Sequence, residues 1–224
     1  MWPAKQIDIS WSDLAFAAAT CFSPGRAAAS ARQLEERWAA EEGLACLSVR
    51  TGFDLLWAAL DLPAGSEVLM SAVTIPDMVR IVQQHRLTPI PIDLDLETLA
   101  PRQESIEEAV TPRTRAIVVA HLFGSRVPMG PILELARRHG LPVIEDLAQG
   151  FAGPNDRGHP DSDMALFSFG TIKTATALGG ALLRVRDREL LARMRAIAAD
   201  YPLQPRRSYL QRVLKYATFK AGLI

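Results

Sequence analysis

From about residue 26 to residue 200, short apolar runs that are typical of β-strands alternate with helical patterns. The clearest strand candidate is Ala116–Ala120, which is uncharged and rich in β-branched residues. The clearest helix is Asp187–Ala199, in which Asp187 is the expected N-cap. Strands separated by helices favour a mainly parallel sheet that is covered on both faces. We therefore predict the α/β class, with a three-layer α/β/α arrangement and a mostly parallel sheet.

The composition excludes several other classes of protein. Of the 224 residues, 49% are hydrophobic and 22% are charged, which is typical of a folded globular protein and not of a disordered, collagen-like or coiled-coil chain. Lys and Arg together number 25, as do Asp and Glu, so no overall basic field would attract DNA or RNA. The two cysteines, Cys21 and Cys46, have no metal-ligand spacing and form no disulfide framework, which favours a reducing, cytoplasmic location.

The chain divides into three expected segments. Residues 1–25 form an N-terminal segment, residues 26–200 a large domain, and residues 201–224 a linker and an amphipathic helix leading toward a small domain that the chain lacks. No apolar run approaches the roughly 20 residues of a transmembrane helix. The first eight residues also lack the apolar core of a signal peptide.

The last helix has an apolar face and five basic residues that no acid opposes. Its expected apolar face consists of Leu210, Val213, Leu214, Ala217 and Ala221, and its basic residues are Arg206, Arg207, Arg212, Lys215 and Lys220. A basic amphipathic helix can lie on a membrane surface. The alternative, which we favour, is a helix that packs against the rest of the protein or leads into a further domain.

Polar residues follow several of the predicted strands. Asp146 and Gln149 come after one strand, and Ser168 and Lys173 follow the next along the chain. Thr51–Gly52 also follows a strand and opens a helix, where free backbone N–H groups can bind a phosphate. In a parallel α/β sheet, ligands gather at the carboxyl ends of the strands. The sequence therefore predicts that these residues share one edge of the sheet.

Each of these residues, taken alone, also has a structural interpretation. Asp146 could cap a helix, Lys173 could lie in a solvated loop, and Thr51–Gly52 could form an ordinary turn. As a set they match the needs of pyridoxal 5′-phosphate, which requires a lysine for an imine, an acid beside its ring nitrogen and a cradle for its phosphate.

Several runs resemble the DegT/DnrJ/EryC1/StrS family, which are pyridoxal-phosphate-dependent sugar aminotransferases of fold type I. Val143–Gln149 (VIEDLAQ) resembles the family segment V-I-E-D-x-A-Q, and Phe167–Lys173 (FSFGTIK) resembles F-S-F-x-x-x-K. Gly179–Ala181 resembles the G-G-x segment that follows. Thr111–Ile117 and His121–Gly124 resemble T-P-x-T-K-A-I and H-L-Y-G. The similarity runs in unbroken order from about residue 26 to residue 200.

The resemblance implies a role for each matched residue. Lys173 would form the imine with the coenzyme and would move the proton on the substrate carbon. Asp146 would pair with the pyridine nitrogen and keep the ring electron-poor. Gln149 would lie near the phenolic oxygen of the ring. Ser168 and the turn at Gly52–Phe53 would hold the phosphate.

Three features depart from the family pattern. Thr51–Gly52–Phe53 stands where the family has S-G-T, so the third hydroxyl is missing, although Thr51 or backbone N–H groups could replace it. Ile75 follows Thr74 where the family has an aromatic ring that stacks on the coenzyme, a loss worth about 1 kcal/mol. The smaller C-terminal domain that closes over the substrate in fold type I enzymes has no counterpart in this chain.

Two further patterns are interpreted as structural. Pro154–Asp163 resembles a short hairpin that precedes the F-S-F strand in the family, so His159 and Asp161 are not expected to bind a metal, and we predict no metal site. Glu145 and Asp146 could suggest the carboxylate pair of a glycosidase. Neighbours on a strand point to opposite faces, however, so both carboxylates cannot easily face one substrate.

The resemblance implies an aminotransferase that acts as a homodimer with its active site at the subunit interface. The expected substrates are a nucleotide-linked keto-sugar and an amino donor such as glutamate, in polysaccharide or secondary-metabolite biosynthesis. Related sugar dehydratases carry a histidine in place of the lysine, so Lys173 disfavours that reaction. The remaining alternative is a noncatalytic homologue that acts as a binding or dimerisation module, which Phe53, Ile75 and the short chain favour.

Overall fold

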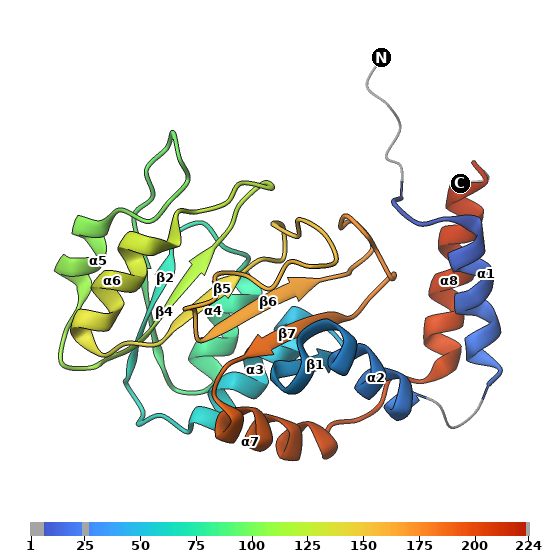
Figure 1. Ribbon diagram of the computed structural model, residues 1–224, viewed down its shortest axis with the longest axis horizontal. Coiled ribbons are helices and arrows are strands. Elements are labelled where there is room, and N and C mark those ends of the chain that lie inside the picture. Colours follow the sequence, from blue (N-terminus) through green and yellow to red (C-terminus); the bar gives the residue numbers. More distant parts are fainter. Residues whose placement is uncertain (1–6, 24–26, 223–224) are drawn as a thin grey trace.

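The computed structural model describes residues 7–23 and 27–222 and contains one seven-stranded sheet (Figure 1). The strand order is β1-β7-β6-β5-β4-β2-β3. Only β7 runs antiparallel to its neighbours, and the other pairs are parallel. The predicted mostly parallel sheet is therefore confirmed. The strands are β1 (Gly43–Cys46), β2 (Glu67–Ser71), β3 (Thr88–Ile92), β4 (Thr114–Ala120), β5 (Val143–Asp146), β6 (Met164–Ser168) and β7 (Ala181–Val185).

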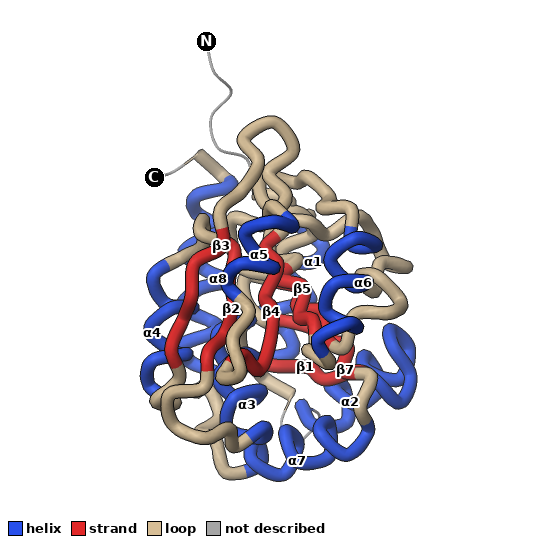
Figure 2. Tube along the Cα trace, turned by 90° about the vertical axis from the view of Figure 1, so that its left-hand side faces the viewer, coloured by secondary structure: helices blue, strands red, loops and turns tan. Residues whose placement is uncertain are grey.

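Helices cover both faces of this sheet, as Figure 2 shows. One apolar cluster lies between the sheet and α3 (Val49–Leu60), α4 (Pro76–Gln84) and α7 (Arg188–Ala199). A second cluster lies between the opposite face and α5 (Gln103–Ala109) and α6 (Met129–His139). On that second face, α2 (Ala27–Ala39) packs Trp38 edge-on against Phe167 of β6. The short 3₁₀ helix η1 (Ala40–Glu42) joins α2 to β1.

Two helices from opposite ends of the described chain pack side by side at one end of the sheet (Figure 1). These are α1 (Trp11–Cys21) and α8 (Arg206–Lys220), which enclose a small apolar cluster that includes Leu14, Val213 and Leu178. The packed interpretation of the last helix therefore holds for α8. Its predicted apolar face is partly wrong, because the side chain of Leu214 is 55% exposed while Tyr209 and Tyr216 contact the cluster.

The predicted hairpin at residues 154–163 is wrong, because the structure has turns there and no strand pairing. Side chains hold this segment instead of a β-ladder. The carboxylate of Asp156 accepts hydrogen bonds from the backbone N–H groups of Ala152 (2.9 Å) and Gly158 (3.1 Å). The buried Arg184 donates to the carbonyl oxygens of His159 (2.6 Å) and Ser162 (2.9 Å).

Several predicted features lie outside the described residues. These are residue 26, where the predicted large domain begins, residues 1–6 of the N-terminal segment, and the final residue, Ile224. Among the residues that the structure does describe, no helix is long and apolar enough to cross a membrane. Cys21 and Cys46 are both free thiols.

Candidate active site

A cavity of about 770 Å³ opens at the carboxyl ends of β5 and β6, beside the beginning of α3. Of the residues that the sequence predicts for the site, Asp146, Ser168, Lys173 and Ile75 all line this cavity. Its volume falls in the range of about 300–1,000 Å³ that is usual for small-molecule sites. The topology thus brings an acid, a lysine and a hydroxyl to one edge of the sheet.

Asp146 is the last residue of β5 and is half-buried in the cavity wall. Its Oδ1 accepts a hydrogen bond from the backbone N–H of Ala148 at 3.0 Å, which fixes the direction of the carboxylate. Burial raises the pKa of Asp146, and the Ala148 N–H and the charge of Lys173 oppose this only in part. The carboxylate therefore gains from a cation placed beside it in the cavity.

Lys173 lies in the loop after β6, where its backbone N–H donates to the carbonyl of Gly170 at 3.0 Å. Burial lowers the pKa of the Lys173 amine, while the negative charge of Asp146 acts in the opposite direction. A lowered pKa increases the share of neutral amine, which is the nucleophilic form of a lysine. Ser168 precedes this loop at the end of β6, and its Oγ lies 3.5 Å from the N–H of Gly170.

Glu145 points to the opposite face of β5, where it is fully buried beside His121. The backbone N–H of Val127 donates to Nδ1 of His121 at 3.1 Å, so the ring proton lies on Nε2 and is donated to Glu145 at 2.9 Å. The second carboxylate oxygen of Glu145 accepts the N–H of His159 at 2.6 Å. Both carboxylate oxygens of Glu145 thus have hydrogen-bond partners within the protein, and of the two neighbouring acids only Asp146 lines the cavity.

The phosphate turn predicted at Gly52–Phe53 is displaced in the structure. Helix α3 begins at Val49, with Ser48 as its N-cap, and the Ser48 hydroxyl accepts the N–H of Thr51 at 3.2 Å. The N–H of Gly52 already donates to the Ser48 carbonyl at 3.1 Å, and Phe53 has no exposed surface. Both residues belong to the interior of α3, and neither lines the cavity.

The N-terminal end of α3 nevertheless faces the cavity, through Ser48, Val49 and Arg50. The first N–H groups of a helix lack partners within the helix, and together with the helix dipole they favour an anion. The helix end that faces the cavity is therefore Ser48–Arg50, and not the predicted turn at Gly52–Phe53. Arg50 also forms a partly exposed ion pair with Asp77 at 3.5 Å.

Packing explains the glycine in the predicted turn. A Cβ atom at Gly52 would lie 2.4 Å from Cδ2 of Leu183 on β7, which is too close for any side chain. Gly52 therefore allows α3 to approach the sheet. Phe53 packs edge-on against Trp57, with 5.1 Å between the ring centroids, so its aromatic ring is part of the hydrophobic core.

Gln149 is also placed differently from its predicted role. Its side chain is exposed, does not line the cavity, and accepts the backbone N–H of Phe123 at 3.1 Å. His159 and Asp161 contact each other locally, since the N–H of Asp161 donates to Nδ1 of His159 at 3.1 Å. In the described part of the chain, no group of three or more His, Cys, Asp or Glu side chains is arranged to hold a metal ion.

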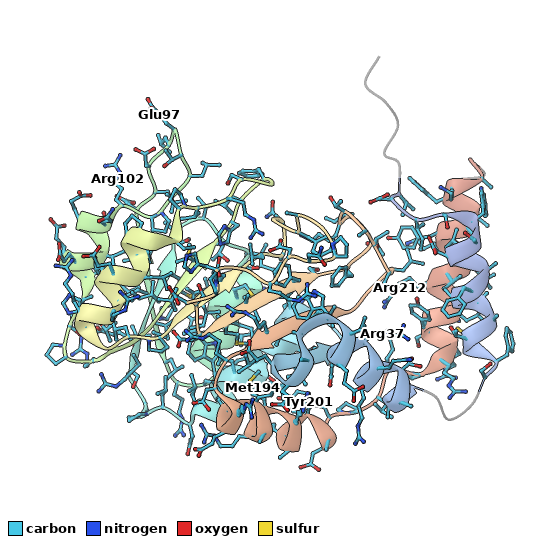
Figure 3. The ribbon with its side chains drawn as sticks, in the orientation of Figure 1. Arg37, Glu97, Arg102, Met194, Tyr201 and Arg212 are labelled. Atoms are coloured by element: carbon cyan, nitrogen blue, oxygen red, sulfur yellow. The ribbon has the colours of Figure 1, made fainter. Side chains whose placement is uncertain are left out.

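One wall of the cavity was not identified from the sequence. It comes from α8, which contributes Gln211, Arg212, Lys215 and Tyr216. Figure 3 shows Arg212 on the side of α8 that faces the sheet, and its Nη1 donates to the carbonyl of Leu178 at 3.0 Å. The unopposed basic residues of this helix were the available signal. They indicate that this side of the cavity suits an anionic group.

Comparisons with known proteins match most of this chain to aminotransferases. The sequence profile of the DegT/DnrJ/EryC1/StrS aminotransferase family matches residues 25–213. A curated relative, GDP-perosamine synthase from Caulobacter vibrioides, is 34% identical over 172 residues, which cover 75% of this chain and 46% of that protein. This chain therefore spans about half the length of that relative.

Solved structures show the same similarity. An aminotransferase from Psychrobacter cryohalolentis has a TM-score of 0.75 at 27% identity, over 87% of this chain and 52% of that one. DesI, solved in the presence of its TDP-sugar product, has a TM-score of 0.72 at 26% identity, over 87% of this chain and 52% of its own.

Proposed function

Because this chain belongs to the DegT/DnrJ/EryC1/StrS aminotransferase family, we propose that it transfers an amino group from an amino acid such as glutamate to a nucleotide-linked keto-sugar. The coenzyme of this family is pyridoxal 5′-phosphate. The observation that carries the proposal is that Asp146 and Lys173 line one cavity and act on each other's charge.

The residues of the cavity fit this coenzyme. They include a lysine with a lowered pKa, a carboxylate that gains from a neighbouring cation, and a helix end that favours a phosphate. Ala148 and Ile75 add apolar surface beside them. When bound, pyridoxal phosphate supplies an electron sink for bond cleavage at the substrate carbon that carries the amino group.

We assign the following roles to the residues of this chain. Lys173 binds the coenzyme through its neutral amine and later carries the proton to and from the substrate carbon. Asp146 holds a proton on the ring nitrogen by its negative charge. Ser168 and the N–H groups at the beginning of α3, from Ser48 to Arg50, bind the phosphate.

The charge of the cavity supports a substrate with phosphate groups. Arg212 and Lys215 face the cavity from α8, and no acidic residue lies on that helix. The names of two relatives agree with this choice, since one is a GDP-perosamine synthase and another was solved with its TDP-sugar product. We propose that these two cations bind the phosphates of a nucleotide-linked sugar.

We further propose a homodimer that works in the cytoplasm. Large apolar side chains are exposed, among them Leu47 and Ile172 (88% exposed), which line the cavity, and Phe123 (77% exposed) in the loop after β4. Exposed apolar surface of this kind favours association with another protein surface. The free thiols of Cys21 and Cys46 suit a reducing compartment.

Absorbance spectroscopy tests the proposed function. We expect the purified chain to become yellow with pyridoxal phosphate, to lose the colour when glutamate is added, and to regain it with a nucleotide-linked keto-sugar. After unbound coenzyme is removed, Lys173→Ala should retain no colour, whereas Lys220→Ala, on α8 and outside the cavity lining, should retain it as the wild type does. Colour that does not respond to any amino donor would favour the noncatalytic alternative, and no colour at all would contradict coenzyme binding.

A further inference from the structure

The loop that carries Lys173 contains two residues in the left-handed region of backbone conformation. Ala175 has φ of 55° and Leu178 has φ of 61°. Residues with a Cβ atom adopt this region at a cost in free energy, and they persist there where the surrounding structure holds them. Contacts with the surrounding structure therefore hold this loop in place.

Part of the loop is held from within. The hydroxyl of Thr176 donates to the carbonyl of Gly170 at 2.7 Å, and the N–H of Gly179 donates to the carbonyl of Phe169 at 3.0 Å. These bonds close the loop on the end of β6. They do not involve the backbone groups of Ala175 or the carbonyl of Leu178.

The N–H of Ala175 and the carbonyls of Ala177 and Leu178 are bound from outside the loop, by α8 and by the residue that leads into α1. The carboxylate of Asp8, just before α1, accepts the N–H of Ala175 at 2.7 Å. The hydroxyl of Tyr209 on α8 donates to the carbonyl of Ala177 at 3.1 Å. Arg212, also on α8, donates to the carbonyl of Leu178 at 3.0 Å.

Packing joins the same elements. The side chain of Leu178 is buried in the apolar cluster between α1 and α8, with Leu14 from one helix and Val213 from the other. A Cβ atom at Gly179 would lie 2.7 Å from Nη1 of Arg212, so the absence of a side chain there allows the guanidinium to reach the loop. The helix pair thus contacts the loop by hydrogen bonds and by apolar packing.

We propose that the helix pair α1–α8 positions Lys173, with Asp8 and Tyr209 as positioning residues that hold the strained loop in the conformation in which the amine faces Asp146. This inference rests on the proposed function. Neither Asp8 nor Tyr209 lines the cavity, so both act through the backbone of the loop and not by touching a reactant. Arg212 lines the cavity as well, and its variants would mix the two effects.

Two measurements on the full chain test this inference. The first is backbone hydrogen exchange of residues 169–180 in protein without coenzyme, and the second is the dissociation constant of pyridoxal phosphate measured by absorbance. Asp8→Ala and Tyr209→Phe should each speed exchange in this loop and weaken coenzyme binding by about tenfold, which corresponds to the strain that the contacts offset.

Two further variants separate positioning from folding. Asp13→Ala removes the capping box of α1, in which Asp13 and Ser10 bind each other, without touching the loop, and should leave both readouts near wild type. Adding Ala175→Gly to Asp8→Ala should recover coenzyme binding, because glycine adopts a positive φ without strain.

The outcomes are distinct from those of the proposed function. If the wild type did not bind the coenzyme, the proposed function would be rejected. Hydrogen exchange of residues 169–180 would still show whether the contacts of the helix pair hold the loop. Unchanged exchange in both Asp8→Ala and Tyr209→Phe would overturn the inference. Faster exchange with unchanged coenzyme affinity, or an equal effect of Asp13→Ala, would overturn it as well.

Discussion

Glu145 and Asp146 are neighbours on β5, yet their carboxylates lie on opposite faces of the sheet. Glu145 accepts hydrogen bonds from His121 and from the backbone of His159 in the protein interior. Asp146 lines the cavity with Lys173. The alternation of side chains along a strand therefore separates a structural carboxylate from one that is available for chemistry.

Glu145→Gln should destabilise the fold in a pH-dependent manner. Burial raises the pKa of Glu145. Its hydrogen bonds, first of all the one from His121, lower the pKa by more than burial raises it, so the pKa lies below the ordinary value of 4.5. The stability that the carboxylate contributes is complete above that value and is lost as the pH falls through the folded-state pKa.

In Glu145→Gln, the amide NH₂ would face a donor, so we expect a loss of about 1–3 kcal/mol at pH 7 that shrinks in acid. Chemical denaturation of both proteins at several pH values measures this difference. Glu97→Gln is the control, since Glu97 lies on an exposed loop (Figure 3). A difference that stays constant with pH would contradict the assigned charge of Glu145.

Asp146→Asn should stabilise the protein in the absence of coenzyme while weakening its activity. Burial raises the pKa of Asp146 above its ordinary value of 3.8. Folding stability therefore falls as the pH rises from 3.8 through the folded-state pKa, and asparagine escapes this loss because it does not ionise.

We expect Asp146→Asn to be the more stable protein at pH 7, and the two proteins to become equal below pH 3.8. With coenzyme, the variant should lose transfer activity by about 10²-fold, because the charge beside the ring nitrogen is absent. Thermal unfolding with and without pyridoxal phosphate provides the measurement. Equal stability of both proteins at pH 7 would contradict this prediction, because it would mean that burying the Asp146 carboxylate does not destabilise the fold.

Gly52→Ala should destabilise the protein without a specific effect on the coenzyme. The new Cβ would lie 2.4 Å from the buried side chain of Leu183, and overpacking of this kind costs about 1–3 kcal/mol. The matched control is Gly130→Ala on α6, where nothing lies within 4 Å and the change should be neutral or stabilising. A coenzyme affinity that falls in Gly52→Ala while stability is unchanged would restore the turn predicted from the sequence.

The sheet was largely predictable from the sequence, because most of its strands are short, predominantly apolar runs that are buried. The predicted strand Ala116–Ala120 lies within β4 and ends at the same residue. The beginning of α3 was missed because Val49, a β-branched residue after an apolar run, extends the strand pattern. Ser48 carried the contrary signal, since serine is a preferred N-cap.

The wall formed by α8 was beyond the reach of local patterns. Which face of α8 is buried depends on its contact with α1, which lies at the other end of the described chain, and this is why Leu214 is exposed. The contact between Arg212 and Leu178 likewise joins residues that no spacing relates. Asp146, Ser168 and Lys173 were predictable because each lies at the end of a strand or in the loop after it, at the edge that the topology fixes.

Lys215→Ala should raise the KM for the nucleotide-linked substrate by about tenfold, which is the usual scale for a charge-assisted contact, and leave coenzyme binding unchanged. Lys215 lines the cavity from α8, whereas Arg206 on the same helix does not, so Arg206→Ala is the control. Steady-state kinetics at low and high salt provide the measurement, and the effect should diminish with salt. An equal rise in KM for both variants would assign the effect to the net charge of the helix.

The most direct test of the central claim is the mapping of the coenzyme onto the chain after borohydride reduction. The chain has four lysines, Lys5, Lys173, Lys215 and Lys220, so peptide mass spectrometry identifies the attachment site without ambiguity. We predict that the added coenzyme mass lies on the peptide that contains Lys173 and is absent from Lys173→Ala. Attachment to another lysine in the wild type, or no added mass after reduction, would contradict the claim that the amine of Lys173 and the carboxylate of Asp146 form one coenzyme site.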